Sequence, residues 1–164
     1  MVGDYVRDKD AVSACMLICE MVMRYSKLGI TLEEVIENLY RKLGYYKENT
    51  INLVMEGLDG MRAMADLMNR LRTSPLSEIA GTDVLNVSDY STGVKTDATS
   101  GEQSKMELSG SNVLRYELSD DTVIIVRPSG TEPKIKVYIL AKGDSMDDCI
   151  SKTKKYTDWA EKLK

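Results

Sequence analysis

The chain has 164 residues, enough for one ordinary domain and a smaller appended piece. Apolar residues make up 43% and charged residues 29%, as in soluble globular proteins, and the net charge of −4 disfavours a general nucleic-acid-binding surface. The absence of histidine removes the commonest general base and the commonest metal ligand.

Three cysteines occur, and two of them, Cys15 and Cys19, are four residues apart in an apolar helical segment. No further cysteine or histidine completes a zinc set with Cys149, so we interpret all three as buried small apolar residues in a reducing compartment and expect no metal site. The longest apolar-rich run, residues 11–23, is too short to span a bilayer, and no signal-peptide pattern opens the chain. A cytoplasmic protein without a membrane partner is predicted.

Two helices are expected in residues 1–44. The first begins near Asp8 or Asp10 and ends at Gly29, and it is apolar on nearly every side, so it needs cover that the preceding residues do not supply. We therefore expect the chain to be part of something larger. The second helix begins with a capping box of Thr31 and Glu34 and ends at Gly44.

Residues 45–164 have the pattern of a self-contained domain. In chain order the expected elements are a strand (45–55), a helix (58–71), a strand (82–90), a long polar loop (91–110), three strands (112–118, 122–126 and 135–141) and a helix (145–163). Strands joined by short connections favour an antiparallel sheet, so the predicted fold class is α+β with helices on one face of that sheet. Residues 1–44 are expected to be a helical piece of another domain plus a connecting helix.

The polar segment 127–134 separates the last two predicted strands and carries groups suited to phosphate. Arg127 can give two parallel charge-assisted hydrogen bonds, and the hydroxyls of Ser129 and Thr131 can each donate one more. Gly130 allows close backbone approach and a positive φ, so neighbouring amides could point into one concavity. A phosphate-binding loop is one prediction; an ordinary polar turn with a solvated arginine is the alternative.

Two lysines follow this segment. Lys134 and Lys136 alternate with apolar residues, so in a strand they share one face and add positive potential beside the loop.

The segment Arg127-Pro-Ser-Gly-Thr-Glu-Pro-Lys-Ile-Lys-Val-Tyr138 resembles the phosphate-binding loop of the α-D-phosphohexomutases, the phosphoglucomutases and phosphomannomutases. Residues 5–12 resemble the stretch that follows the sugar-recognition loop in the third of that family's four domains. The resemblance implies that residues 45–164 form the last domain, a TATA-binding-protein-like α+β unit. Its loop holds the phosphate that is not being transferred. Residues 1–44 would then be the helical tail of the third domain and a connecting helix.

The resemblance also implies two sets of substrate contacts. The phosphate-binding positions are Arg127, Ser129, Gly130, Thr131 and Lys136. Lys9 and Lys134 are possible substrate contacts, with a solvated lysine as the alternative for each.

The family's phosphoserine loop, its Asp-rich magnesium loop and its Glu-Glu-Ser sugar-recognition motif are not in this sequence. The resemblance therefore implies no catalytic residue and no metal ligand here, and an inactive fragment. The full-length parent is expected to move a phosphoryl group between C1 and C6 of a hexose, with Mg²⁺ and glucose 1,6-bisphosphate. Its partners would be the sugar phosphate and the remaining N-terminal domains. A phosphopentomutase or phosphoglucosamine mutase fragment, or a non-enzymatic phosphate-binding or interaction module, are the alternatives.

Overall fold

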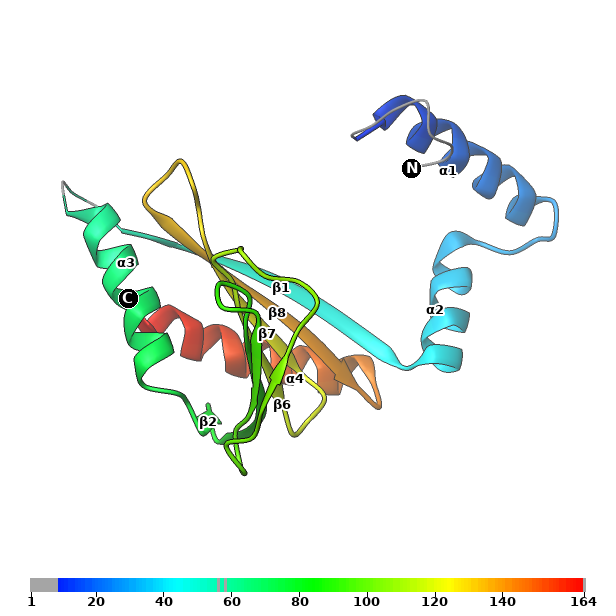
Figure 1. The fold of residues 1–164 in the computed structure, drawn as a ribbon. Helices are drawn as coiled ribbons and strands as arrows, with labels where there is room; N and C mark the ends of the chain where they lie inside the picture. Colours follow the sequence, from blue (N-terminus) through cyan, green and yellow to red (C-terminus); the bar gives the residue numbers. More distant parts are fainter. Residues whose placement is uncertain (1–8, 56, 58, 164) are drawn as a thin grey trace. The chain divides into compact units, whose positions relative to one another are not determined.

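The computed structural model describes residues 9–55, 57 and 59–163. The chain divides into two compact units, Met1–Gly44 and Tyr45–Lys164 (Figure 1). Residues 5–8 of the N-terminal segment with the family resemblance, and Asp8 as a possible helix start, lie outside the described residues.

The first unit consists of helices α1 (Ala11–Ser26) and α2 (Leu32–Leu43). Asp10 caps α1 because its carboxylate accepts the Ser13 amide at 3.1 Å. In α2 the Thr31 hydroxyl accepts the Glu34 amide at 3.2 Å, and the Glu34 carboxylate accepts the Thr31 amide at 2.7 Å. This capping box is confirmed as the sequence predicts it.

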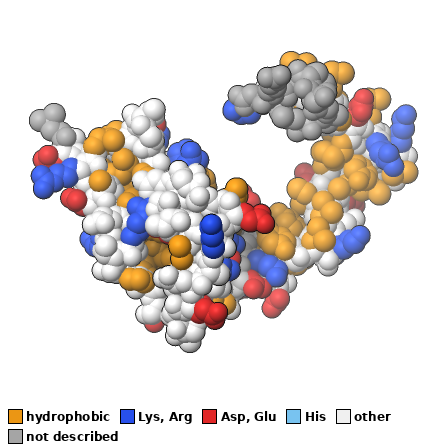
Figure 2. Space-filling model, in the orientation of Figure 1, with side chains coloured by type: hydrophobic (Ala, Val, Ile, Leu, Met, Phe, Trp, Pro, Cys, Tyr) orange, Lys and Arg blue, Asp and Glu red, His pale blue; other side chains and the backbone are white. Residues whose placement is uncertain are grey.

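Helix α1 has no buried residue, and its apolar side chains are visible in Figure 2. Cys15 and Cys19 are exposed, so their expected burial is wrong; only Cys149, in the second unit, is buried. The physical reason is that a helix with apolar residues on every side needs several packing partners. The described residues of this unit provide only one further helix, and it buries nothing either.

The second unit is built on an antiparallel sheet with the strand order β1-β8-β7-β6-β3-β4-β5, with β2 paired to β3. The strands are β1 (Tyr45–Val54), β2 (Glu78–Ile79), β3 (Thr82–Asp89), β4 (Val94–Asp97), β5 (Gln103–Lys105), β6 (Leu114–Leu118), β7 (Val123–Pro128) and β8 (Lys134–Gly143). The long strands β1 and β8 are neighbours across their whole length (Figure 1).

Strands β4 and β5 correct the prediction of one long loop over residues 91–110. They form a hairpin at the edge of the sheet, where β4 pairs with β3 and β5 pairs with β4. The turn between them is closed by Asp97, whose carboxylate accepts the amides of Ser100 at 2.7 Å and Thr99 at 2.9 Å. An edge hairpin needs backbone partners more than apolar side chains, so its polar composition conceals it.

Two helices cover one face of this sheet. Helix α3 (Gly60–Thr73) contributes Met64, Leu67, Met68 and Leu71 to the core, and α4 (Met146–Ala160), continued by the 3-10 turn Glu161–Leu163, contributes Tyr156 and Ala160. Along β8 the side chains alternate, because Ile135, Val137 and Ile139 are 0% exposed while their neighbours are partly exposed. The predicted α+β class with helices on one face is thereby confirmed. The opposite face of the sheet, called here the open face, carries the polar residues of β7 and β8.

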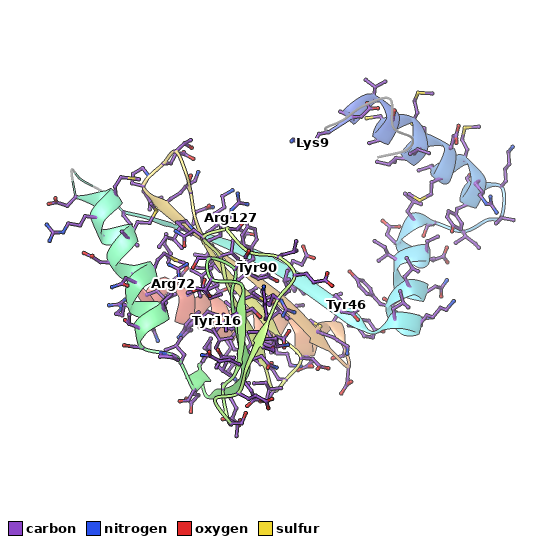
Figure 3. The ribbon with its side chains drawn as sticks, in the orientation of Figure 1. Lys9, Tyr46, Arg72, Tyr90, Tyr116 and Arg127 are labelled. Carbon is purple, nitrogen blue, oxygen red and sulfur yellow. The ribbon has the colours of Figure 1, made fainter. Side chains whose placement is uncertain are left out.

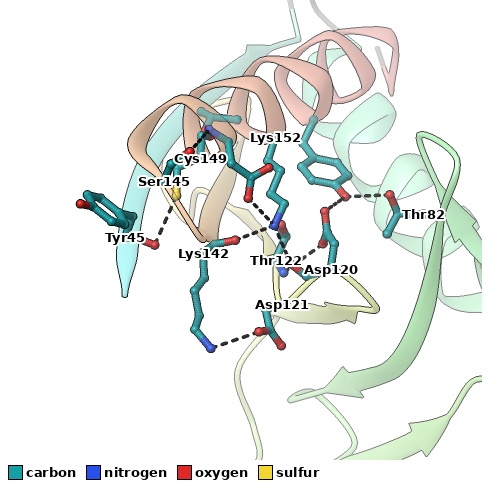
Figure 4. A network of polar contacts seen from close by, with 12 residues as sticks. Tyr45, Thr82, Asp120, Asp121, Thr122, Lys142, Ser145, Cys149 and Lys152 are labelled. Atoms are coloured by element: carbon teal, nitrogen blue, oxygen red, sulfur yellow. Dashed lines mark hydrogen bonds and ion pairs between the residues drawn. The ribbon is translucent and has the colours of Figure 1, made fainter. Parts of the chain in front are cut away.

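A polar network ties α4 to the β6–β7 turn (Figure 4). The Tyr156 hydroxyl donates to Oδ2 of Asp120 at 2.6 Å and lies 2.9 Å from Oγ1 of Thr82. The Lys152 ammonium donates to the carbonyl oxygens of Asp120 and Lys142 at 3.1 and 2.8 Å. Burial by itself would raise the pKa of Asp120, but the hydrogen bonds it accepts, first that from Tyr156, outweigh burial and lower it.

Candidate anion site at the β7–β8 turn

The β7–β8 pairing places two cations side by side on the open face. Arg127 and Lys136 are direct partners in the register, and Pro128 pairs with Ile135. Directly opposed residues of an antiparallel pair project to the same side of the sheet. Because Ile135 faces the core, the side chains of Arg127 and Lys136 point away from α3 and α4 (Figure 3 labels Arg127). Lys134 lies two residues before Lys136 and shares this face.

The turn itself is closed by its own hydrogen bonds. The Ser129 amide donates to the Lys134 carbonyl at 2.9 Å, and the Lys134 amide donates to the Glu132 carbonyl at 2.7 Å. The hydroxyl oxygen of Ser129 accepts the amides of Thr131 at 3.4 Å and Glu132 at 3.3 Å. These two distances are long for N–H···O bonds, so the hydrogen bonds are weak and the amides can be given up to another acceptor. The amides of Thr131 and Glu132 therefore both point toward Oγ of Ser129.

Gly130 departs from the sequence-based expectation. It is not among the glycines with positive φ, and a Cβ built on it meets no atom within 4 Å. The positive φ that glycine allows is therefore not used at this position, and the hydroxyl of Ser129 gathers the amides instead. The free loop has room for a side chain at this position.

The base of the turn is fastened to the segment that leads into α3. The Met55 amide donates to the Pro133 carbonyl at 2.8 Å. A Cβ built on Gly60 would lie 2.2 Å from the Met55 carbonyl oxygen and 3.1 Å from Cβ of Pro133, so only glycine fits the first residue of α3. The sequence patterns do not predict this anchor. The glycine just inside the predicted helix over 58–71 is the one signal for it.

Charge pairing separates the three cations of the hairpin. Neither Arg127 nor Lys136 has an ion-pair partner within 4.0 Å among the residues that the structure describes. Lys134, by contrast, lies 2.6 Å from Oε2 of Glu132. Two positive groups without an ion-pair partner in the described part of the chain therefore lie beside a turn whose amides are weakly hydrogen-bonded, and this combination is suited to an anion.

Two other cations of the open face are neutralised. Lys95 lies 2.9 Å from Oε2 of Glu117, and Arg115 pairs with the other oxygen of the same carboxylate. Burial alone would raise the pKa of Glu117, but the hydrogen bonds from Arg115 and Lys95 outweigh burial, and the net effect is a lowered pKa. The positive charge available on this face is therefore concentrated at the end that carries the turn.

The structure brings together five of the expected residues: Arg127, Lys134 and Lys136 share one face of the hairpin, and Ser129 and Thr131 belong to its turn. Gly130 lies between the two hydroxyl residues of this turn. Lys9 belongs to the helical unit, and the fold of the second unit does not position it (Figure 3).

A separate hollow of about 520 Å³ lies between the end of α3 and the β4–β5 hairpin. Arg72 donates to Asp89 at 3.1 Å at its wall, so these charges satisfy one another. The nearby Tyr116 hydroxyl is buried, which raises its pKa, and it has no hydrogen-bond partner among the described residues (Figure 3). None of residues 127–136 lines this hollow, and it offers an anion no unpaired cation.

Across residues 9–55, 57 and 59–163, no three His, Cys, Asp or Glu side chains come together in a way that could hold a metal ion. In the same residues, no helix has both the length and the apolar character needed to cross a membrane.

The sheet with helices on one face, together with the β7–β8 turn, defines a class of domain. Comparison with known proteins shows to which family this domain belongs. Residues 51–147 match the family model described as the phosphoglucomutase/phosphomannomutase C-terminal domain. The chain therefore belongs to the phosphoglucomutase/phosphomannomutase family and includes its C-terminal domain, which confirms the resemblance seen in the sequence.

Particular relatives agree with this. The phosphoglucomutase of Staphylococcus saprophyticus is 35% identical over 142 residues, which cover 87% of this chain and 26% of the relative. A phosphoglucomutase of Staphylococcus aureus is 36% identical over 148 residues, 90% of this chain and 27% of the relative. The chain thus spans about a quarter of the length of these curated relatives.

Among solved structures, the open form of pp63/parafusin from Paramecium, a phosphoglucomutase, aligns with a TM-score of 0.50. The alignment covers 96% of this chain and 28% of that chain at 17% sequence identity, so it supports the fold alone.

Proposed function

We propose that this chain is the part of a phosphohexomutase that binds the non-transferred phosphate of a hexose phosphate. The phosphate would be held by Arg127, Ser129, Gly130, Thr131 and Lys136. The observation that carries the proposal is the register of β7 and β8. It sets Arg127 and Lys136 side by side, without ion-pair partners among the described residues, next to a turn whose amides are weakly hydrogen-bonded.

These groups divide the work of holding a phosphate. The planar guanidinium of Arg127 can give two parallel hydrogen bonds to phosphate oxygens, and the ammonium of Lys136 adds a compact positive charge. The hydroxyls of Ser129 and Thr131 can rotate to donate to a third oxygen. Because strands β7 and β8 are paired up to the turn, the cations start from a rigid frame, which reduces the ordering cost of binding.

In the parent enzyme this site would act by positioning. A phosphoryl group moves between C1 and C6 of the sugar, and fixing the distal phosphate limits the orientations that the reacting end can adopt. In the parent, the N-terminal domains would take part in binding Mg²⁺ and glucose 1,6-bisphosphate, because the described residues bring no three metal ligands together. The isolated chain is therefore expected to have no mutase activity.

Further assignments follow from the same proposal. The first unit would be the helical tail of the third domain with its connecting helix, and the second unit the phosphate-binding domain. Lys134 would be an additional contact from the same strand face, and Lys9 one from the helical unit. Three free thiols fit a reducing compartment such as the cytoplasm.

A phosphate titration of the chain, followed by amide NMR, tests the site. We expect the amides of Gly130, Thr131 and Glu132 to shift at millimolar phosphate, and Arg127→Ala to weaken binding about tenfold or more. Lys136→Met should also weaken binding.

The matched control is Lys142→Met. Lys142 lies on the same strand and the same face, six residues further on, and therefore roughly 20 Å from Lys136. The Lys142→Met variant should leave phosphate affinity unchanged. No amide response at millimolar phosphate, or equal losses for Lys136→Met and Lys142→Met, would refute the site.

A further inference from the structure

One of the three cations of the hairpin is already occupied by a carboxylate of the loop itself. The Lys134 ammonium lies 2.6 Å from Oε2 of Glu132, and the main-chain bond from the Lys134 amide to the Glu132 carbonyl fixes both residues in one turn. The Lys134 side chain is 24% exposed, whereas that of Glu132 is 58% exposed. The carboxylate is thus the more accessible member of the pair.

Glu132 is charged at neutral pH. The hydrogen bond from Lys134 and then the charge of Lys134 hold its pKa below the ordinary value of 4.5; desolvation opposes them less strongly, and the charge of Lys136 adds a smaller lowering. The three cations Arg127, Lys134 and Lys136 therefore share one anion of the loop, and the hairpin end keeps a net positive charge.

The backbone donors of the turn are occupied in a similar way. The Ser129 hydroxyl oxygen accepts the amides of Thr131 and Glu132 at 3.4 and 3.3 Å. Both kinds of donor that a phosphate would use, an ammonium and neighbouring amides, are thus held by acceptors of the loop in the free protein. A bound phosphate has to replace these acceptors before it gains their donors.

We propose that Glu132 is an internal competitor of phosphate, which holds Lys134 in the free loop and lowers the affinity of the site. This inference rests on the proposed phosphate site at Arg127 and Lys136. A phosphate carries one to two negative charges at neutral pH, so at the turn it is repelled by the Glu132 carboxylate. It also gains Lys134 only by breaking the existing pair. Glu132 thereby limits how tightly phosphate is held and favours its release.

The test is Glu132→Gln, which keeps the shape of the side chain and removes its charge. Inorganic phosphate is titrated into the chain at pH 7 and constant ionic strength, and amide NMR gives the Kd. We expect a Kd about three- to tenfold lower than that of the unmodified chain. In a Lys134→Met background the gain should be smaller, because part of the competition acts through Lys134.

Asp121→Asn is the matched control. It removes a carboxylate that pairs with Lys142 at 3.0 Å at the other end of β8, so the change in net charge is the same. An unchanged or higher Kd for Glu132→Gln, or equal tightening by Asp121→Asn, overturns the competitor role while leaving the site in place. If neither the unmodified chain nor Glu132→Gln responds to phosphate, the phosphate site itself is refuted.

Discussion

Two glycines near the turn should respond to alanine in opposite ways. Gly130 is outside the left-handed region and a Cβ there meets nothing within 4 Å, so Gly130→Ala restricts mainly the unfolded chain. It should raise the free energy of unfolding by about 0.4–1 kcal/mol. At Gly60 the new Cβ would lie 2.2 Å from the Met55 carbonyl oxygen. Gly60→Ala should lower the free energy of unfolding by about 1–3 kcal/mol, because backbone has to move.

Both alanine variants should bind phosphate more weakly, although they change the free energy of unfolding in opposite directions. We expect Gly130→Ala to weaken phosphate binding about tenfold, since the methyl group stands where the proposed ligand approaches the backbone, a loss of about 1.4 kcal/mol. Gly60→Ala should also weaken binding, because it displaces Pro133 at the base of the turn. Urea unfolding followed by the fluorescence of Trp159, the single tryptophan, measures stability, and amide NMR measures affinity.

Three results would contradict these expectations for Gly130 and Gly60. A Gly130→Ala variant less stable than the unmodified chain would mean that the loop needs a glycine for its own conformation. A Gly130→Ala variant with unchanged phosphate affinity would mean that phosphate does not approach this part of the backbone. A Gly60→Ala variant of full stability would mean that the tight packing against Met55 and Pro133 is absent in solution.

Other predictions concern the frame around the site. Ile135→Ala should lower the free energy of unfolding by about 2–5 kcal/mol in urea, because its side chain is 0% exposed beside the turn; a loss under 1 kcal/mol would contradict this packing. Asp120→Asn should cost about 1–2 kcal/mol at pH 7. The pKa of Asp120 is lowered from 3.8 by folding, so its contribution is complete above that pH and is lost as the pH falls through the lower folded value. The stability difference between the two proteins should therefore shrink below pH 3.8, and a difference independent of pH would exclude the charged hydrogen bonds as its cause. Burial raises the pKa of the Cys149 thiol, so a disulfide reagent should modify the two thiols of α1 in the folded chain and Cys149 only after unfolding; equal rates for all three thiols would contradict this.

Local patterns in the sequence predicted most elements of the second unit. The alternation from Lys134 onward predicted a half-buried strand, and β8 shows that alternation. The sequence predicts a strand over 45–55, and this strand is β1, which ends at Val54. The helix predicted over 58–71 is α3, shifted by two residues to Gly60–Thr73. Periodicity identifies such elements because it reflects which side chains face a core, whatever that core contains.

Burial and strand pairing that depend on distant segments cannot be predicted from local patterns in the sequence. The sequence pattern predicts a loop where the β4–β5 hairpin lies, because the strands of this hairpin are held by backbone pairing at a sheet edge. The burial expected for Cys15 and Cys19 depended on partners that the helical unit does not contain. The composition of the turn allows a positive φ at Gly130, but only the folded turn shows that the Ser129 hydroxyl gathers the amides instead.

The chemistry of the 127–134 segment can be read along the chain: its guanidinium, its hydroxyls and flanking lysines, and the strand periodicity that sets Lys134 and Lys136 on one face. Which of these groups are available to a ligand depends on the folded domain. Register places Arg127 beside Lys136, and the turn pairs Lys134 with its own Glu132. Contact with Met55 and Gly60, more than 70 residues earlier, fixes the base of the loop. Spacing along the chain can specify a face, but pairing between segments distant in sequence arises only when the sheet and its helices assemble.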